Sequence, residues 1–242
     1  MSTILVDADT YGGCVGQLLG FLEESPGLPA AARLATAGRL DVAALAGVAR
    51  VIGSSLRVLT GITRADRWPE LPPDSVGTVL DLCRRLATLV VVDCGFSLEQ
   101  DEELVYDTAA PRRNGATIAA IQAAELVLAV GAADPVGLHR LVRGLVDLRE
   151  LVPTTHVQVA LNKLRRGITP GDPAAEVTAA LRRHAGIVDP VLLPYERTAL
   201  DRALGQGRTL AEVAPGAPLR RALVGLTKTL PGVRTRVPSR QR

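Results

Sequence analysis

The sequence predicts an α/β fold with a doubly wound, mostly parallel sheet and helices on both of its faces. Short aliphatic and β-branched runs alternate with longer helical segments, the pattern of successive βαβ units. Several runs, such as Leu89–Val92, are apolar throughout, as expected for strands covered by helices on both faces. No linker is long enough to cut the chain in two. We therefore expect one domain over residues 1–230 and a flexible Arg-rich tail over residues 231–242.

Each element is predicted from local pattern and punctuation. Strands are expected where β-branched and aliphatic residues cluster between turn residues. They are Thr3–Val6, Leu56–Thr60, Leu89–Val92, Leu126–Val130, Val157–Leu161 and Val188–Leu193. Helices are expected in the longer segments between and after them. They are Val15–Leu22, Asp41–Val51, Val76–Ala87, Ala116–Ala123, Pro135–Glu150, Ala174–His184 and Leu219–Leu226. Gly and Pro residues in the intervening stretches, such as Pro72-Pro73, mark the turns.

The composition excludes several classes of protein. Of 242 residues, 47% are hydrophobic and 22% charged, which is the balance of a globular chain and not of a disordered one. No apolar run approaches the roughly 18 residues of a membrane span, and the first residues do not form a signal peptide. Three scattered cysteines are too few for a disulfide framework or a zinc site. A cytoplasmic protein is expected.

Two apolar strands end in aspartates followed by turns of small residues. The motif VDADTYGG closes the first strand and carries Asp7 and Asp9, and the motif VVVDCG carries Asp93. Ligands of open α/β sheets bind beyond the carboxyl ends of the strands, and carboxylates there can hold the water shell of Mg²⁺. Aspartates at such positions also cap turns and helices, which is the commoner role for one such residue alone. The presence of two such strands modestly favours a ligand site over a capping role.

These motifs, followed by LNK at residues 161–163 and LLPYE at residues 192–196, resemble the MinD/ParA family of dimeric P-loop ATPases. Within that family the chain is most similar to the CpaE-like or TadZ-like proteins of pilus assembly, which are often labelled septum-site or chromosome-partitioning proteins. The resemblance covers residues 3 to about 226. It implies ATP and Mg²⁺ as ligands.

The resemblance also implies roles for four residues. Asp9 would lie in switch I, near the attacking water and the metal shell, and would be catalytic. Asp93 would be the Walker B aspartate, which contacts Mg²⁺ through water. Asn162 would hydrogen-bond the adenine edge, and Pro194 would begin the segment that lines the base pocket.

The chain departs from the family in one respect. A P-loop needs a Gly-rich turn, a lysine that reaches the phosphates and a Ser or Thr on Mg²⁺. In the family this loop precedes the strand that ends in the VDAD motif, but here that strand begins the sequence and no lysine occurs before Lys163. Gly12-Gly13 follows the aspartates and lacks the Lys-Ser/Thr pair. Residues 1–242 are therefore expected to lack a phosphate cradle.

Two explanations of this departure remain open. The chain is either a truncated form whose P-loop is encoded upstream of Met1, or a pseudo-ATPase scaffold that acts through protein contacts. Truncation is favoured, because loss of a central strand would expose two strand edges, while Asp9, Asp93 and Asn162 are retained. The intact protein is expected to be a homodimeric ATPase that positions a pilus, secretion, division or partitioning machine. The present chain is expected to hydrolyse ATP poorly or not at all.

Two further segments have two interpretations each. The acidic run Glu99–Glu103 and the sequence Pro111–Asn114 occupy the place of switch II, and fit a solvated loop or a nucleotide-sensing role equally well. The last helix, Leu219–Leu226, has one apolar stripe flanked by basic residues. The stripe is expected to pack on the domain; peripheral contact with the inner membrane face, or with DNA through the arginine tail, is the weaker alternative.

Overall fold

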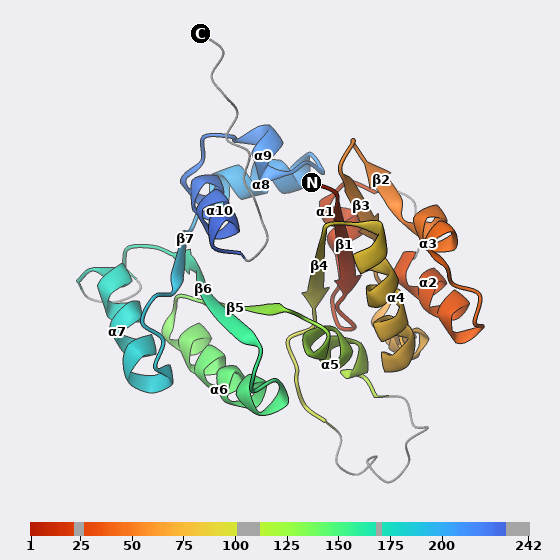
Figure 1. Cartoon of the computed structure of the whole chain (residues 1–242). Coiled ribbons are helices and arrows are strands. Elements are labelled where there is room, and N and C mark those ends of the chain that lie inside the picture. The colour runs from red at the N-terminus through yellow and green to blue at the C-terminus, as the bar shows by residue number, and fades with distance from the viewer. Residues whose placement is uncertain (22–26, 101–111, 168–170, 231–242) are drawn as a thin grey trace. The chain divides into compact units, whose positions relative to one another are not determined.

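The computed structural model describes residues 1–21, 27–100, 112–167 and 171–230, and its class is α/β, as predicted (Figure 1). Contacts divide the chain into two compact units, Met1–Ala124 and Glu125–Arg242. Each unit contains its own hydrogen-bonded sheet. The predicted single domain over residues 1–230 stays a prediction, and the predicted tail lies outside the described residues.

The first unit contains a four-stranded sheet in the order β2-β3-β1-β4. Its strands are β1 (Thr3–Ala8), β2 (Arg50–Ile52), β3 (Leu56–Leu59) and β4 (Leu89–Cys94). β1 lies between β3 and β4 and is parallel to both, whereas β2 is antiparallel to β3. The helices are α1 (Val15–Leu18), α2 (Gly27–Thr36), α3 (Val42–Val48), the 3-10 helix η1 (Ala65–Glu70), α4 (Pro73–Leu86) and α5 (Gly115–Gln122).

The core of the first unit lies on one face of this sheet. Ile4, Val6 and Ala8 point from β1 into the cluster that α2, α4 and α5 cover. Because side chains alternate along a strand, Leu5 and Asp7 belong to the opposite face. On β4, the neighbours of Leu5 and Asp7 are Val91 and Asp93. β4 is one of the two edge strands of this sheet, and Val91 is 43% exposed.

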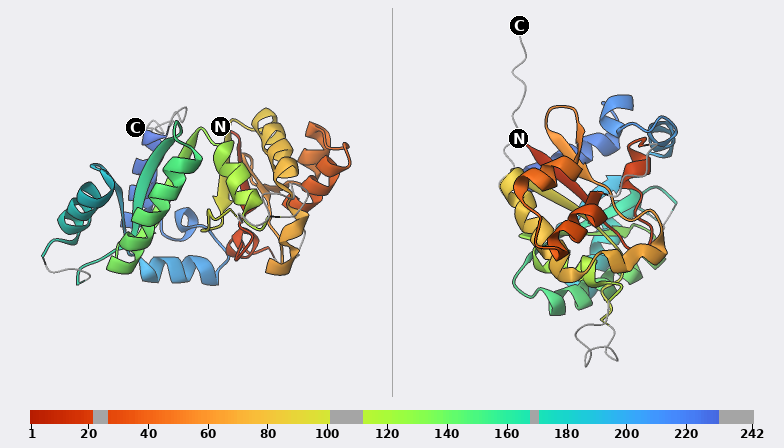
Figure 2. Two further views of the ribbon diagram at one scale, coloured as in Figure 1. Left: turned by 90° about the horizontal axis from the view of Figure 1, so that it is seen from below. Right: turned by 90° about the vertical axis from the view of Figure 1, so that its right-hand side faces the viewer.

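The second unit contains a parallel three-stranded sheet in the order β5-β6-β7. Its elements are β5 (Leu126–Ala132), α6 (Pro135–Leu151), β6 (His156–Leu164), α7 (Pro173–Ala185), β7 (Val191–Pro194), α8 (Arg197–Gly205), α9 (Leu210–Val213) and α10 (Pro218–Thr229). Helices α6 and α7 lie on one side of this sheet and α10 on the other (Figures 1 and 2). β5 is an edge strand whose Leu128 and Val130 are 36% and 57% exposed.

Most predicted elements are present, with three corrections. The helix predicted over Asp41–Val51 ends at Val48, because Ala49 is extended and the chain enters the β2–β3 hairpin. The strand predicted from Val188 begins only at Val191, after Pro190, which has no N–H to donate. The helix predicted over Val15–Leu22 ends at Leu18, before Gly20 at a φ of 71°. Helices α2, α8 and α9 and η1 were not predicted.

The apolar stripe of the last helix packs within its own unit, as expected. Leu219 and Leu226 of α10 are buried, and Leu219 contacts Ala160 of β6 and Leu193 of β7. Leu223 remains partly exposed. None of the helices in the described residues combines the length and the apolar character needed to cross a bilayer.

Helix α6 provides a test of packing in the second unit. It begins with an Asp-Pro pair, in which Asp134 accepts a hydrogen bond from the Gly137 amide at 2.8 Å. A Cβ at Gly137 would lie 2.6 Å from the Cβ of Ala132 in β5, whereas one at Gly144 would meet nothing within 4 Å. We expect Gly137→Ala to destabilise the protein by about 2 kcal/mol through overpacking, and Gly144→Ala to stabilise it by about 0.5–1 kcal/mol. Urea unfolding followed by circular dichroism measures both effects. Equal effects of the two substitutions would contradict the close approach of Gly137 to Ala132.

Candidate functional site

Three carboxylates come together at the carboxyl end of the first unit's sheet. In the parallel pairing of β1 with β4, Asp7 is the register partner of Asp93. Asp9 lies immediately after β1, in the turn that follows. A Cβ at Gly95, two residues after Asp93, would lie 3.3 Å from Oδ1 of Asp9, so the Asp9 side chain lies beside the end of β4. The sequence motifs that carry Asp9 and Asp93 therefore meet in space, although they lie 84 residues apart (93 − 9).

Asp7 is the buried member of this group. It is 2% exposed, and its two carboxylate oxygens accept hydrogen bonds from the amides of Val15 (3.1 Å) and Asp9 (3.3 Å). Burial raises its pKa to about 6, with smaller contributions from the charges of Asp93 and Asp9, and the two amides oppose this shift. Asp7 was not among the predicted site residues. The signal that identifies it is its position as the penultimate residue of the buried strand β1.

Asp9 and Asp93 are the accessible members. Asp9 accepts a hydrogen bond from the Tyr11 amide on Oδ1 at 2.8 Å. Asp93 is exposed, and partial desolvation and the charge of Asp9 raise its pKa. Among the described residues no hydrogen-bond donor contacts the Asp93 carboxylate. Both residues can therefore offer oxygen atoms to a ligand, as the predicted metal roles require.

These carboxylates suit a magnesium ion that keeps much of its water shell. Mg²⁺ is commonly held by one or two carboxylates together with waters and phosphate oxygens. Within the described residues, no group of three or more His, Cys, Asp or Glu side chains is arranged to hold a metal directly. Asp9 and Asp93 would therefore contribute to such a site, and Asp7, whose oxygens are already engaged, would support it.

Phosphate, in contrast, does not fit the residues around these carboxylates. The glycine pair Gly12-Gly13 lies against carboxylates: a Cβ at Gly13 would overlap Asp7, and one at Gly12 would lie 3.9 Å from Asp9. A turn that faces carboxylates repels phosphate. The structure provides no basis for a step of ATP hydrolysis carried out by these residues alone.

The thiols near the carboxylates are not nucleophiles. Burial, followed by the charges of Asp93, Asp9 and Asp7, raises the pKa of Cys94 to about 12. The pKa of Cys14 is raised by burial and by the same three aspartates. Protonated thiols of this kind are poor nucleophiles and poor metal ligands.

The other two predicted site residues lie in the second unit, on neighbouring strands. Asn162 is near the end of β6, and its side-chain oxygen accepts the Lys163 amide at 2.8 Å. Lys163 has a φ of 61° at an irregularity in the pairing of β6 with β7. Pro194 ends β7 and is paired with Leu164. The amide nitrogen of Asn162 has no acceptor among the described residues, which leaves a donor for a ligand such as a base edge.

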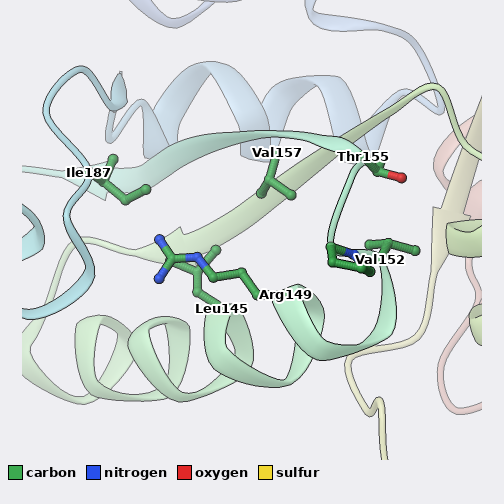
Figure 3. Close-up of a pocket in the computed structure, with 7 residues that line it drawn as sticks. Leu145, Arg149, Val152, Thr155, Val157 and Ile187 are labelled. Carbon is green, nitrogen blue, oxygen red and sulfur yellow. The ribbon is translucent and has the colours of Figure 1, made fainter.

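A separate cavity of about 390 Å³ lies in the second unit, between the end of α6, the start of β6 and the segment after α7 (Figure 3). Most of its lining is apolar, including Leu145, Val157 and Ile187. The guanidinium of Arg149 borders it and donates to the Ala185 carbonyl at 2.7 Å. The lining contains no carboxylate, histidine or thiol, so the cavity provides no ligands for a metal ion.

Solved structures identify the class of fold. The described chain is similar to a ParA family ATPase from Chlorobium tepidum TLS, with a TM-score of 0.73, 16% identity and coverage of 93% of this chain and 84% of that one. It is also similar to the septum site-determining protein MinD with Mg-ADP from Pyrococcus horikoshii OT3 (TM-score 0.65, 14% identity, coverage 93% and 81%). The MinC:MinD complex of Aquifex aeolicus gives a TM-score of 0.66 at 14% identity, with coverage of 98% and 85%.

The fold is therefore similar to that of the ParA and MinD ATPases, an α/β fold with a mostly parallel sheet and helices, as predicted. No model of a known protein family matches the sequence, and no curated protein matches it. At these identities the likeness concerns the fold alone.

The raised pKa of Asp7 predicts an unusual dependence of stability on pH. A carboxyl whose folded pKa is raised contributes stability below its unfolded pKa of about 3.8 and loses it as pH rises through about 6. The change between pH 4 and 7 amounts to about 2.4 kcal/mol, at about 1.4 kcal/mol for each pKa unit. Urea unfolding in EDTA should therefore show this loss relative to Asp7→Asn, which cannot titrate there. Parallel pH profiles for the two proteins would contradict it.

Proposed function

We propose that this chain is part of a MinD/ParA-type ATPase of the CpaE-like branch, which positions a pilus, secretion, division or partitioning machine. The observation that carries the proposal is the convergence of Asp9 and Asp93 at one sheet edge within a ParA-like fold. Asp93 and Asp9 would hold Mg²⁺, with Asp9 also orienting the attacking water. Asn162 and Pro194 would contact the adenine. The working form would be a cytoplasmic homodimer, with peripheral contact to membrane or DNA as a secondary option.

We further propose that the phosphate cradle is supplied from outside residues 1–242. The sequence has no lysine before Lys163. The edge strands β4 and β5 support the proposal, because each bears valines that a central, helix-covered strand would bury: Val91 on β4 and Val130 on β5. A β-strand followed by a phosphate-binding loop and a helix would pair with such an edge and cover its apolar face. Without this segment the chain would not hydrolyse ATP.

A non-catalytic scaffold is the second candidate. The absence of a P-loop lysine from the first 162 residues favours it, since a chain without ATP chemistry needs none. A related fold can act through protein contacts, because MinD of Aquifex aeolicus has been crystallised with MinC. In this role the surface that would form the dimer or bind a partner in the ATPase would bind a protein of the division or pilus machine without nucleotide.

Calorimetry with Mg²⁺-ATP separates these functions. The chain as it stands is compared with one extended at its N-terminus by the segment encoded upstream in frame, about 50 residues, enough for a strand, a loop and a helix. Binding by the extended chain alone, lost in Asp93→Asn and weakened in Asn162→Ala, supports the ATPase. A stop codon directly upstream, or no binding by either chain, favours the scaffold. Tight binding by the short chain would overturn the proposed external cradle.

A further inference from the structure

The turn that carries Asp9 is bonded to a segment that lies about 100 residues further along the chain. Thr10, 1% exposed, donates its hydroxyl hydrogen to the Arg113 carbonyl at 3.1 Å. The Tyr11 hydroxyl donates to Oδ1 of Asn114 at 2.9 Å. The Arg113 guanidinium lies 4.1 Å from the centre of the Tyr11 ring, within the range of a cation–π contact. Side-chain and backbone contacts thus join the Asp9 turn to the residues just before α5.

Asn114 extends this connection to the residues that follow β4. Its amide nitrogen donates to the hydroxyl of Ser97 at 3.2 Å and to the carbonyl of Glu99 at 2.8 Å. The ring of Phe96, which is 83% exposed, lies 4.8 Å from that of Tyr11. Asn114 therefore uses both ends of its amide, one towards the Asp9 turn and the other towards the segment after Asp93.

Tyr11 transmits this connection to the Asp9 carboxylate, because the same residue makes both contacts. Its backbone amide donates to Oδ1 of Asp9 at 2.8 Å, while its hydroxyl is held by Asn114. We propose that Tyr11 is a positioning residue, which fixes the Asp9 carboxylate through its amide and makes that position depend on Asn114 and the segment after β4. The consequence for metal affinity rests on the proposed function, in which Asp9 contributes to the Mg²⁺ site.

Hydrogen exchange and metal binding test this role separately. The variants are Tyr11→Phe, which keeps the ring and removes the hydroxyl, Asn114→Ala, and the double variant. The matched control is Thr78→Val, which removes the hydrogen bond from the Thr78 hydroxyl to the Asp74 carbonyl (3.0 Å) on α4 of the same unit. The first readout is exchange of the Tyr11 amide, and the second is Mn²⁺ affinity measured by electron paramagnetic resonance.

Loss of one hydrogen bond changes an equilibrium by about two- to tenfold. We expect each single variant to speed exchange of the Tyr11 amide and to weaken Mn²⁺ binding by about that factor, with Thr78→Val unchanged. Because both single variants remove the same bond, the double variant should be no worse than the stronger single one. The faster exchange should be confined to the Tyr11 amide. A general loss of stability would instead speed exchange at amides throughout the first unit.

The outcomes distinguish this inference from the proposed function. Unchanged exchange at Tyr11 in Asn114→Ala, or effects that simply add in the double variant, would overturn the positioning role. If the wild-type chain binds no Mn²⁺, the metal site of the proposed function fails, while exchange still decides whether Asn114 holds the Asp9 turn through Tyr11. Faster exchange together with unchanged Mn²⁺ affinity would overturn the claim that this contact positions Asp9 for the metal.

Discussion

Replacing Gly13 by alanine is expected to abolish the affinity of the aspartate cluster for divalent cations and to destabilise the first unit by about 2–4 kcal/mol. A Cβ at Gly13 would overlap Oδ1 of Asp7 and lie 2.9 Å from the carbonyl oxygen of Asp9. Gly61 also packs closely against Asp7, because a Cβ at Gly61 would lie 2.8 Å from the Asp7 Cγ. The carboxylate is thus packed against two glycines and held by the Val15 amide, which leaves it little room to move.

The neighbouring glycine provides the control. A Cβ at Gly12 would meet only the Asp9 carboxylate, at 3.9 Å, which is an ordinary contact. Gly12→Ala should therefore keep the stability and the Mn²⁺ affinity of the wild type. Urea unfolding and Mn²⁺ titration by electron paramagnetic resonance measure both properties. If Gly13→Ala bound Mn²⁺ with the same affinity as Gly12→Ala, the close packing around Asp7 would not be needed for the metal site.

The strands were predictable from sequence because each is a local apolar run between turns. β1, β4 and β5 all begin at the predicted residue. The hairpin strand β2 was not predictable in the same way, since Arg50–Ile52 continues a helical pattern and becomes a strand only by pairing with β3. α2 begins at Gly27 and contains Pro29, residue types that indicate a turn, but a proline in the first turn of a helix loses no internal hydrogen bond.

The site was predictable in part, for a similar reason. Asp9 and Asp93 follow predicted strands, and parallel pairing brings such positions to one edge of a sheet. The enclosed position of Asp7 depends on Gly61, which lies 54 residues away (61 − 7) and which no local pattern identifies, as well as on the nearby Val15 amide. The Tyr11–Asn114 contact joins residues 103 positions apart, so it emerges only from the tertiary structure.

Lysine substitutions at the two sheet edges are expected to be tolerated in the chain alone but to impair ATP binding in a chain completed by a phosphate-binding segment. Val91 and Val130 are 43% and 57% exposed in the described structure. Val91→Lys and Val130→Lys should therefore change the stability of the present chain by no more than about 0.5 kcal/mol. They should also reduce its self-association, because charged residues on an exposed edge oppose pairing with other chains.

In the completed chain the same lysines would lie on covered, central strands. Burial of an unpaired ammonium group is opposed by several kcal/mol, so each variant should lose ATP affinity by about a hundredfold or more. Val146→Lys on α6, where the valine is 51% exposed, is the matched control and should bind ATP normally. Sedimentation velocity measures the first effect and calorimetry the second. Normal ATP binding by the completed Val91→Lys and Val130→Lys chains would show that neither edge accepts the phosphate-binding segment, and it would overturn this explanation of the exposed strands.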